Sequence, residues 1–235
     1  MRLDKFLCEM NQGTRSQVKD LIRKKQVSVN GTIVTKPETQ IQENTDRIVL
    51  QGREICYQKY VYYMLNKPRG FVSATTDSRE RTVLDLLGEQ KANDLFPVGR
   101  LDKDTEGLLL ITNNGDLAHR MLSPKKHVDK TYLVSLDTPL SDTAKDRLEQ
   151  GVDIGEEKLT APARVERVDE HRILLTIQEG KFHQVKRMLQ AVDNKVTALT
   201  RVSFGPLTLD QTLGPGMFRS LTREEQETLE SLNQK

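Results

Sequence analysis

The sequence predicts an α+β protein in which a small basic N-terminal unit precedes a larger unit built on a mixed, largely antiparallel sheet. Two short amphipathic helical patterns and a hairpin signal occupy the first 34 residues. After residue 58, strand-forming runs are mixed with helical ones, without the regular alternation typical of a parallel sheet. We therefore expect two domains, over residues 1–58 and 59–235.

The N-terminal unit begins with two predicted helices. Apolar residues at 3, 6, 7 and 10 form one buried stripe, and Thr14 with Gln17 is typical of a capping box that opens the second helix. Asn30-Gly31 between two β-rich runs predicts a tight hairpin, because both turn positions need a positive φ. Cations follow the exposed side and the end of the second helix, namely Arg15, Lys19, Arg23 and Lys24.

This unit is the electropositive part of the chain. Residues 1–58 hold ten lysines and arginines against seven acidic residues, although the whole chain has a formal charge of only +2. A solvated helix face would explain the cations alone. Together with the hairpin, however, the segments RLDKFL, TRSQVKDLI and VSVNG resemble the alpha-L RNA-binding module. The resemblance implies that the second helix lies against RNA phosphates, with salt-sensitive and largely sequence-independent affinity.

The larger unit contains alternating and continuous apolar runs. A helix is also predicted at the C-terminal end, where Thr222 and Glu225 have capping-box spacing. The predicted strands are 61–65, 107–112, 130–136, 163–168 and 172–178, and the predicted helices are 82–88, 116–122, 140–151 and 181–192.

Several classes of protein are disfavoured by the composition. Cys8 and Cys56 lie far apart without a metal-ligand spacing, so neither a disulfide framework nor a zinc site is predicted. The N-terminus is charged, and no apolar run approaches the roughly 20 residues of a membrane span. We expect a cytoplasmic protein that does not associate with membranes.

Three acidic residues, Asp102, Asp104 and Glu106, alternate just before the apolar run GLLLIT. They match the start of a calcium loop, but its twelfth position is Asn113 where a bidentate glutamate is needed. Neighbouring carboxylates are also poorly placed to flank one glycosidic bond from opposite faces. Taken alone, the segment is therefore a charged turn before a buried strand.

The segment is accompanied by three other motifs. In chain order the four are MLNKPRGFVSA, GRLDKDTEGLLLITNNGD, HVDKTYLV and EGKFHQVKRML. Together they resemble the pseudouridine synthase branch that contains the bacterial ribosomal small-subunit enzyme, over nearly the whole chain. The resemblance implies that the bond between uracil nitrogen and ribose is broken, the base rotates, and it is rejoined through carbon 5. Because substrate and product contain the same atoms, neither a cofactor nor a metal is expected.

The resemblance also implies an active site. Asp102 matches the catalytic aspartate, and Tyr132 is placed against the flipped uracil, where it helps to remove the carbon 5 proton. A cation is expected beside Asp102, because desolvation disfavours an ionised carboxylate. If residues 181–192 form one helix with Phe182 on its apolar face, Lys186 borders that face and is the expected partner.

Further RNA contacts are expected in the larger unit. Arg100 is expected to fill the gap left by the flipped base or to hold its phosphate, since the glycosidic carbon is inaccessible in a stacked helix. The other expected contacts are Lys67, Arg69, Lys181, His183 and Arg187. Asp104 is assigned to local structure, as a cap for backbone amides.

The expected substrate is small-subunit ribosomal RNA or its assembling particle, and the expected state is a monomer. A large-subunit rRNA synthase of the same branch would differ in target site and not in mechanism. A non-catalytic rRNA-binding assembly factor would keep the fold without the chemistry. The joint presence of Asp102, Tyr132 and Lys186 favours an enzyme, whereas its target depends on RNA shape, which one sequence does not reveal.

Overall fold

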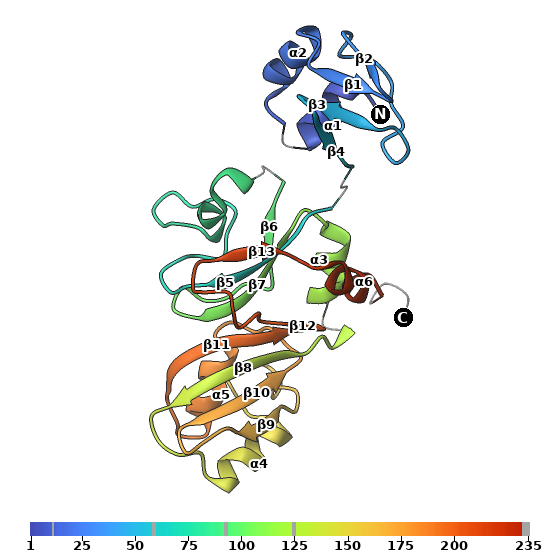
Figure 1. The fold of residues 1–235 in the computed structure, drawn as a ribbon. Helices are drawn as coiled ribbons and strands as arrows, with labels where there is room; N and C mark the ends of the chain where they lie inside the picture. The colour runs from blue at the N-terminus through green and yellow to red at the C-terminus, as the bar shows by residue number, and fades with distance from the viewer. Residues whose placement is uncertain (11, 58–59, 92–93, 124–125, 232–235) are drawn as a thin grey trace. The chain divides into compact units, whose positions relative to one another are not determined.

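The computed structural model describes residues 1–10, 12–57, 60–91, 94–123 and 126–231. The chain divides into two compact units, Met1–Tyr60 and Val61–Lys235 (Figure 1). Each unit combines helices with a sheet of its own, so the predicted α+β class is confirmed. None of the described helices combines the length and apolar character needed to cross a membrane.

The small unit packs two helices against a four-stranded antiparallel sheet. The capping box is formed, because Thr14 N donates to Gln17 Oε1 at 2.8 Å and Gln17 N to Thr14 Oγ1 at 3.4 Å. Asn30 and Gly31 have φ angles of 51° and 80°, as the hairpin requires. The elements are α1 (Leu3–Glu9), α2 (Arg15–Arg23), β1 (Val27–Val29), β2 (Thr32–Ile33), β3 (Ile48–Leu50) and β4 (Arg53–Ile55), with strand order β2-β1-β3-β4.

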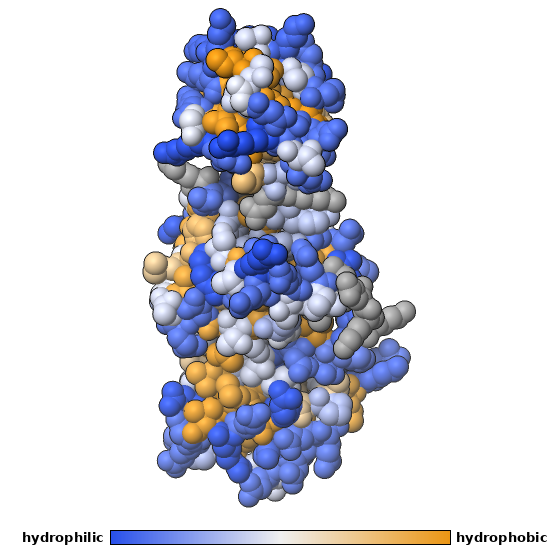
Figure 2. Space-filling view, turned by 45° about the vertical axis from the view of Figure 1, so that its right-hand side comes forward, coloured by the Kyte–Doolittle hydropathy of each residue, from blue (hydrophilic) through white to orange (hydrophobic). Residues whose placement is uncertain are grey.

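Helix α2 has two chemically different sides. Val18 and Ile22 are fully buried in the core of the small unit. The four predicted phosphate contacts, Arg15, Lys19, Arg23 and Lys24, are exposed or half-buried. In Figure 2, hydrophilic side chains surround a hydrophobic patch on the visible face of this unit. The cations are therefore available to a polyanion.

The large unit is built on a nine-stranded sheet. In the described pairings only β7 and β11 run parallel, so the sheet is mixed and largely antiparallel as predicted. The strand order is β13-β5-β7-β11-β8-β10-β9, with β6 on β7 and β12 on β11. The strands are β5 (Tyr62–Lys67), β6 (Phe96–Val98), β7 (Glu106–Thr112), β8 (Lys130–Leu136), β9 (Arg164–Arg167), β10 (Arg172–Ile177), β11 (Val196–Phe204), β12 (Leu207–Thr208) and β13 (Phe218–Ser220).

Helices flank this sheet, and one of them begins later than predicted. His183 precedes the helix at 184–191 with a left-handed φ of 49°, so residues 181–183 form a loop and not its first turn. The segment predicted at 82–88 forms a 3-10 helix. The helical elements are η1 (Val83–Gln90), α3 (Gly115–Leu122), α4 (Asp142–Gln150), α5 (Gln184–Ala191) and α6 (Arg223–Ser231).

Two parts of this unit position the site. Strand β7 lies between β5 and β11, and Leu108–Ile111 are fully buried, which explains its uninterrupted apolar run. Helix α5 lies against the sheet at β8 and β10, with Val185, Met188 and Leu189 in the core (Figure 1). The start of β7 and the first turn of α5 thereby become neighbours.

Candidate active site

The loop that carries Asp102 connects β6 to β7, and the Lys67 side chain binds its backbone. The Lys67 side chain is fully buried at the end of β5. Its ammonium group donates to four backbone carbonyl oxygens, those of Pro68 at 3.1 Å, Asp102 at 3.0 Å, Lys103 at 3.3 Å and Thr105 at 2.8 Å. Ser73 adds a reciprocal pair with the Leu101 backbone, at 2.8 and 3.0 Å. The loop backbone is thus fixed on both sides of Asp102.

The prediction that Lys67 contacts RNA is wrong, because its side chain is inaccessible. Burial lowers the pKa of Lys67 to about 8, although the nearby carboxylates of Asp104, Asp102 and Glu106 act in the opposite direction. An ammonium group carries three donors, and all the oxygens it meets here belong to the protein. Lys67 supports the Asp102 loop instead of binding phosphate.

Replacing Lys67 with methionine should destabilise the protein by about 2–3 kcal/mol at neutral pH, since several buried carbonyls lose their donor. The unfolded chain binds more protons than the folded one between pH 8 and pH 10.5, so Lys67 makes wild-type stability rise across that window. Lys67→Met removes this rise, and the stability deficit of the variant should widen by roughly 3 kcal/mol from pH 8 to pH 10.5. Chemical denaturation at several pH values measures both effects. Equal deficits at pH 8 and pH 10 would contradict the pH part.

A glycine allows β7 to start directly beside β11. Gly107 has a φ of +100°, and a Cβ built there would lie 2.3 Å from the Arg201 carbonyl oxygen. A larger residue would push the start of β7 away from β11 and move the loop that precedes it.

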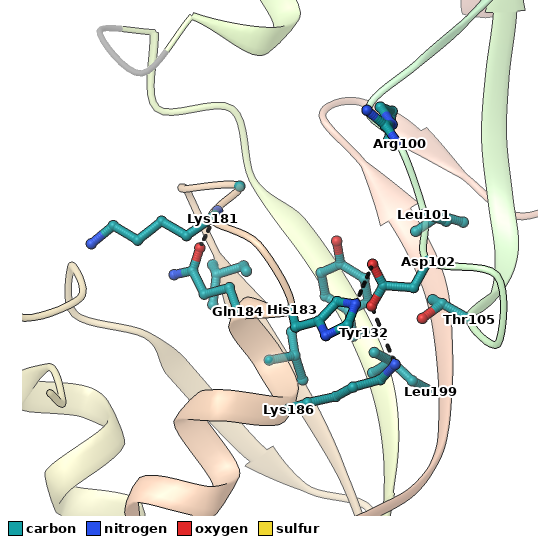
Figure 3. A pocket seen from close by; sticks show the side chains of 13 residues that line it. Arg100, Leu101, Asp102, Thr105, Tyr132, Lys181, His183, Gln184, Lys186 and Leu199 are labelled. Carbon is teal, nitrogen blue, oxygen red and sulfur yellow. Dashed lines mark hydrogen bonds and ion pairs between the residues drawn. The ribbon is translucent and has the colours of Figure 1, made fainter. Parts of the chain in front are cut away.

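The charged groups of the site come from two distant parts of the chain. Lys186 Nζ, on α5, lies 3.2 Å from Asp102 Oδ2 (Figure 3). The same nitrogen lies 2.6 Å from Asp104 Oδ1. His183 Nε2 lies 3.6 Å from the other Asp102 oxygen, Oδ1. The structure therefore brings Asp102 and Lys186 together as the sequence analysis expected. Asp104, which was expected to cap backbone amides, instead shares the Lys186 ammonium group.

These contacts fix the charges of the Lys186 pair. Burial acts to lower the pKa of Lys186, but hydrogen bonds and charges from Asp104 and Asp102 outweigh it and leave the pKa above its ordinary value. The hydrogen bond from Lys186 lowers the pKa of Asp104. At neutral pH the site therefore holds a permanent cation within hydrogen-bond distance of Asp102.

The Asp102 carboxylate borders a pocket that is open to solvent. Tyr132, on β8, is 8 % exposed and lines the pocket with apolar side chains from neighbouring strands and from α5. Thr105 also lines it, and its buried hydroxyl has no hydrogen-bond partner among the described residues. The lining residues are Arg100, Leu101, Asp102, Thr105, Tyr132, Ile177, Gly180, Lys181, His183, Gln184, Val185, Lys186 and Leu199. The pocket thus presents a carboxylate and a cation beside an aromatic ring.

The other expected RNA contacts are divided by the structure. Arg100 is exposed at the pocket, and Lys181 is half-buried there with its Nζ 3.3 Å from Glu179 Oε1. Arg69 is outside the pocket lining and pairs with Glu106 at 3.1 Å. Arg100, Lys181 and His183 therefore surround the pocket, whereas Arg69 is paired beside it.

The structure places the Arg187 guanidinium group among protein acceptors, and its contact with phosphate stays a prediction. Its guanidinium group donates to the Ile154 carbonyl oxygen, to the Phe182 carbonyl oxygen at 3.0 Å and to Glu156 Oε1 at 2.8 Å. Three protein acceptors therefore hold it, and it joins the loop before α5 to residues 154–156. Phe182, expected on the apolar face of the helix, lies in that loop and is 75 % exposed.

Arg201 is a residue of this region that the sequence analysis missed. It is 1 % exposed on β11, directly opposite Tyr132 on β8. Its side chain donates to the carbonyl oxygens of Leu108 and Gly99, both at 2.8 Å, and thereby ties β7 to the beginning of the Asp102 loop. Burial lowers the pKa of Arg201, while the Tyr132 hydroxyl acts in the opposite direction. An arginine inside the strand-like segment VTALTRVSF was the available signal.

Comparison with known proteins gives two family matches. The RNA pseudouridylate synthase family matches residues 61–191, which is more than half of the chain. The S4 domain family matches residues 1–46.

Curated relatives and a solved structure match almost end to end. "Uncharacterized RNA pseudouridine synthase YtzG" of Bacillus subtilis is 46 % identical over 230 residues, with 96 % of both chains covered. "Ribosomal small subunit pseudouridine synthase A" of Escherichia coli K12 is 42 % identical over 227 residues, covering 96 % of this chain and 98 % of the relative. A solved structure titled "Crystal structure of pseudouridylate synthase" has a TM-score of 0.70 and 40 % identity, covering 97 % of this chain and 99 % of its own.

These matches confirm the resemblance inferred from the four motifs and from the basic N-terminal segment. Apart from Leu199, the residues that line the pocket lie in the matched region, and the Asp102 loop belongs to the motif that carried the resemblance. The chain is therefore a pseudouridine synthase, an isomerase that belongs to the RNA pseudouridylate synthase family and carries an S4 domain at its N-terminal end.

Proposed function

We propose that this protein converts a specific uridine of small-subunit ribosomal RNA to pseudouridine, with Asp102 as its catalytic carboxylate. The observation that carries the chemical part is the contact between Asp102 and Lys186 at the edge of a pocket that Tyr132 lines. The choice of RNA is supported by near full-length similarity to relatives named as ribosomal small subunit enzymes.

The proposed reaction uses the pocket as follows. The target uridine flips out of its RNA, because its glycosidic carbon is inaccessible in the stack. The ionised Asp102 assists cleavage of the bond between N1 and C1′, and Lys186 balances its charge. The base rotates and a bond forms between C5 and C1′, after which C5 loses its proton and N1 carries one. The Tyr132 ring supports the uracil, and its hydroxyl helps to remove the C5 proton.

Other side chains are proposed to hold the RNA around the flipped nucleotide. Arg100 and Lys181 lie at the pocket, where an RNA backbone must pass. In the small unit, the cations of α2 supply phosphate contacts that strengthen binding without selecting a sequence. We propose that a monomer in the cytoplasm acts on this RNA or on its assembling particle.

The target is testable by mapping pseudouridines in ribosomal RNA from cells with and without the gene. We expect one pseudouridine to disappear from small-subunit RNA and to return when purified protein is added. The addition is made to protein-free RNA and, separately, to partly assembled particles, which identifies the natural substrate. A missing pseudouridine in large-subunit RNA would instead assign the chain to that substrate. An unchanged map would favour a non-catalytic assembly factor.

A further inference from the structure

The side chain of Phe182 is an exposed aromatic group beside the pocket. It is 75 % exposed, more than the other large hydrophobic residues on the described surface. Single exposed apolar side chains are common and need no explanation by themselves. The surroundings of this one are unusual, because the next residue in the chain, His183, lines the pocket.

The Phe182 ring stacks on a side chain of the pocket, and the backbone of its loop is hydrogen-bonded on both sides. It stacks on the His183 imidazole with a centroid distance of 3.8 Å and an interplanar angle of 18°. His183 Nε2 in turn lies 3.6 Å from Asp102 Oδ1, as Figure 3 shows. The Phe182 carbonyl accepts from Arg187 at 3.0 Å, and Lys181 N donates to the Gln184 side chain at 2.9 Å. The His183 imidazole therefore contacts the Asp102 carboxylate through Nε2 and stacks on the exposed Phe182 ring through its face.

The exposed ring suits a flat apolar group. Three cations occur next to it in the segment KFHQVKR, residues 181–187, and each is already paired with a carboxylate of the protein, so the ring itself is the group left open to a ligand. Among the described ring contacts, that of Phe182 is with His183, and its high exposure leaves most of the ring open to solvent. Aromatic faces of this kind bind unpaired bases in single-stranded RNA with little sequence preference, because every base has a π-face.

We propose that Phe182 is a stacking platform for an unpaired base of the RNA, the base on one side of the target uridine. The inference rests on the proposed function, because it requires a uridine in the pocket beside Asp102. Flipping that uridine removes the stacking partner of its neighbours. The Phe182 ring replaces this lost contact just outside the pocket, so it contributes affinity for the flipped state and little preference for base identity.

The test compares substitutions that keep or remove the aromatic ring. Phe182→Leu and Phe182→Ala should raise KM by about 10- to 100-fold, whereas Phe182→Tyr should stay within about two-fold of wild type. Val168→Ala is the matched control, because Val168 is also exposed but lies beyond the end of β9 and outside the pocket lining. The substrate is the small-subunit rRNA fragment identified by the mapping above. Equal KM values for the leucine variant and the wild type would overturn the proposal.

Abasic substrates locate the contact. The nucleotide on the 5′ or the 3′ side of the target is replaced by an abasic one, and KM is measured for wild type and Phe182→Ala. For one of the two neighbouring nucleotides, the effects of the abasic substitution and of Phe182→Ala on KM should not add, because either change alone already removes the stacking contact. Full additivity on both sides would overturn the proposal.

A binding measurement separates this inference from the proposed function. Anisotropy of a labelled single-stranded oligouridylate is measured with wild type, Phe182→Leu and Phe182→Tyr, independently of turnover. Binding that depends on the aromatic ring supports the platform even if the wild type modifies no ribosomal RNA, and that result would overturn only the proposed function. Wild-type turnover together with binding that does not depend on the ring would overturn only the platform.

Discussion

Asp102→Asn should abolish pseudouridine formation and leave RNA affinity within about two-fold of wild type. Asparagine keeps the size of the side chain but cannot provide an ionised carboxylate, so a loss on the order of 10⁴-fold or more is expected. The loop itself should persist, because its anchors reach the backbone and not the Asp102 carboxylate. Release of tritium from RNA labelled at carbon 5 of uridine measures turnover, and filter binding measures affinity.

Asp104→Asn is the matched control for this variant. Asp102 and Asp104 both contact Lys186 Nζ, at 3.2 and 2.6 Å, so either substitution removes one negative charge from the same cation. We expect Asp104→Asn to lose less than about ten-fold, because the Asp102 carboxylate remains paired with Lys186. Comparable losses of turnover in both variants would indicate that the total negative charge beside Lys186 matters, and that Asp102 has no particular role. Near wild-type activity of Asp102→Asn would refute the assignment.

Lys186→Met should lower kcat by about 100- to 1000-fold, the range found when one preorganised electrostatic partner is removed from an active site. Among the described contacts, Lys186 is the lysine or arginine within hydrogen-bond distance of the Asp102 carboxylate. The Lys186 side chain is 28 % exposed, so its ion pairs are partly solvated and add little to stability. The thermal midpoint should therefore change by only a few degrees. Single-turnover assays and thermal melts check the two parts.

Lys186→Arg controls for charge, because arginine restores a cation at the same position. We expect it to recover at least about a tenth of wild-type kcat, with the remaining loss due to the bulk and geometry of the guanidinium group. If Lys186→Met turned over normally, Lys186 would not be needed to balance the charge of Asp102, and His183, which faces the other Asp102 oxygen, would be the next side chain to replace. Arg187 would not take it over, because three protein acceptors hold its guanidinium group.

The helices and strands predicted correctly are those in which buried positions recur with a regular period, so that apolar residues recur in the sequence at the same spacing. Strand β8 has its predicted bounds, Lys130–Leu136, because its side chains alternate strictly between buried and half-buried. Strand β11 was missed, because VTALTRVSF places threonines and an arginine in a strand paired on both sides. The short strands β3, β4 and β6 have only three residues each, too few to show a period.

The candidate site was predicted correctly where a sequence motif and the helical spacing of apolar residues pointed to the same side chain, as they did for Lys186. The border position of Lys186 on the helix survives a later start of α5, because residues 184–191 keep their spacing. Phe182 was wrongly expected on the apolar face of the helix. The left-handed backbone of His183 makes the helix begin after residue 183, so Phe182 is not part of it. Lys67 and Arg187 were both expected to bind RNA, since a sequence shows that a cation is present but not which carbonyl oxygens surround it.

The anchoring of the Asp102 loop has an energetic consequence. Lys67 from β5, Ser73 from the segment after it and Arg201 from β11 each bond to the loop backbone between residues 99 and 105. A loop backbone held in this way is preorganised, so little free energy is needed to rearrange it when substrate arrives. In the proposed reaction, the cost of reaching the reactive geometry then falls on the RNA, which must unstack and rotate a nucleotide toward a loop that stays in place.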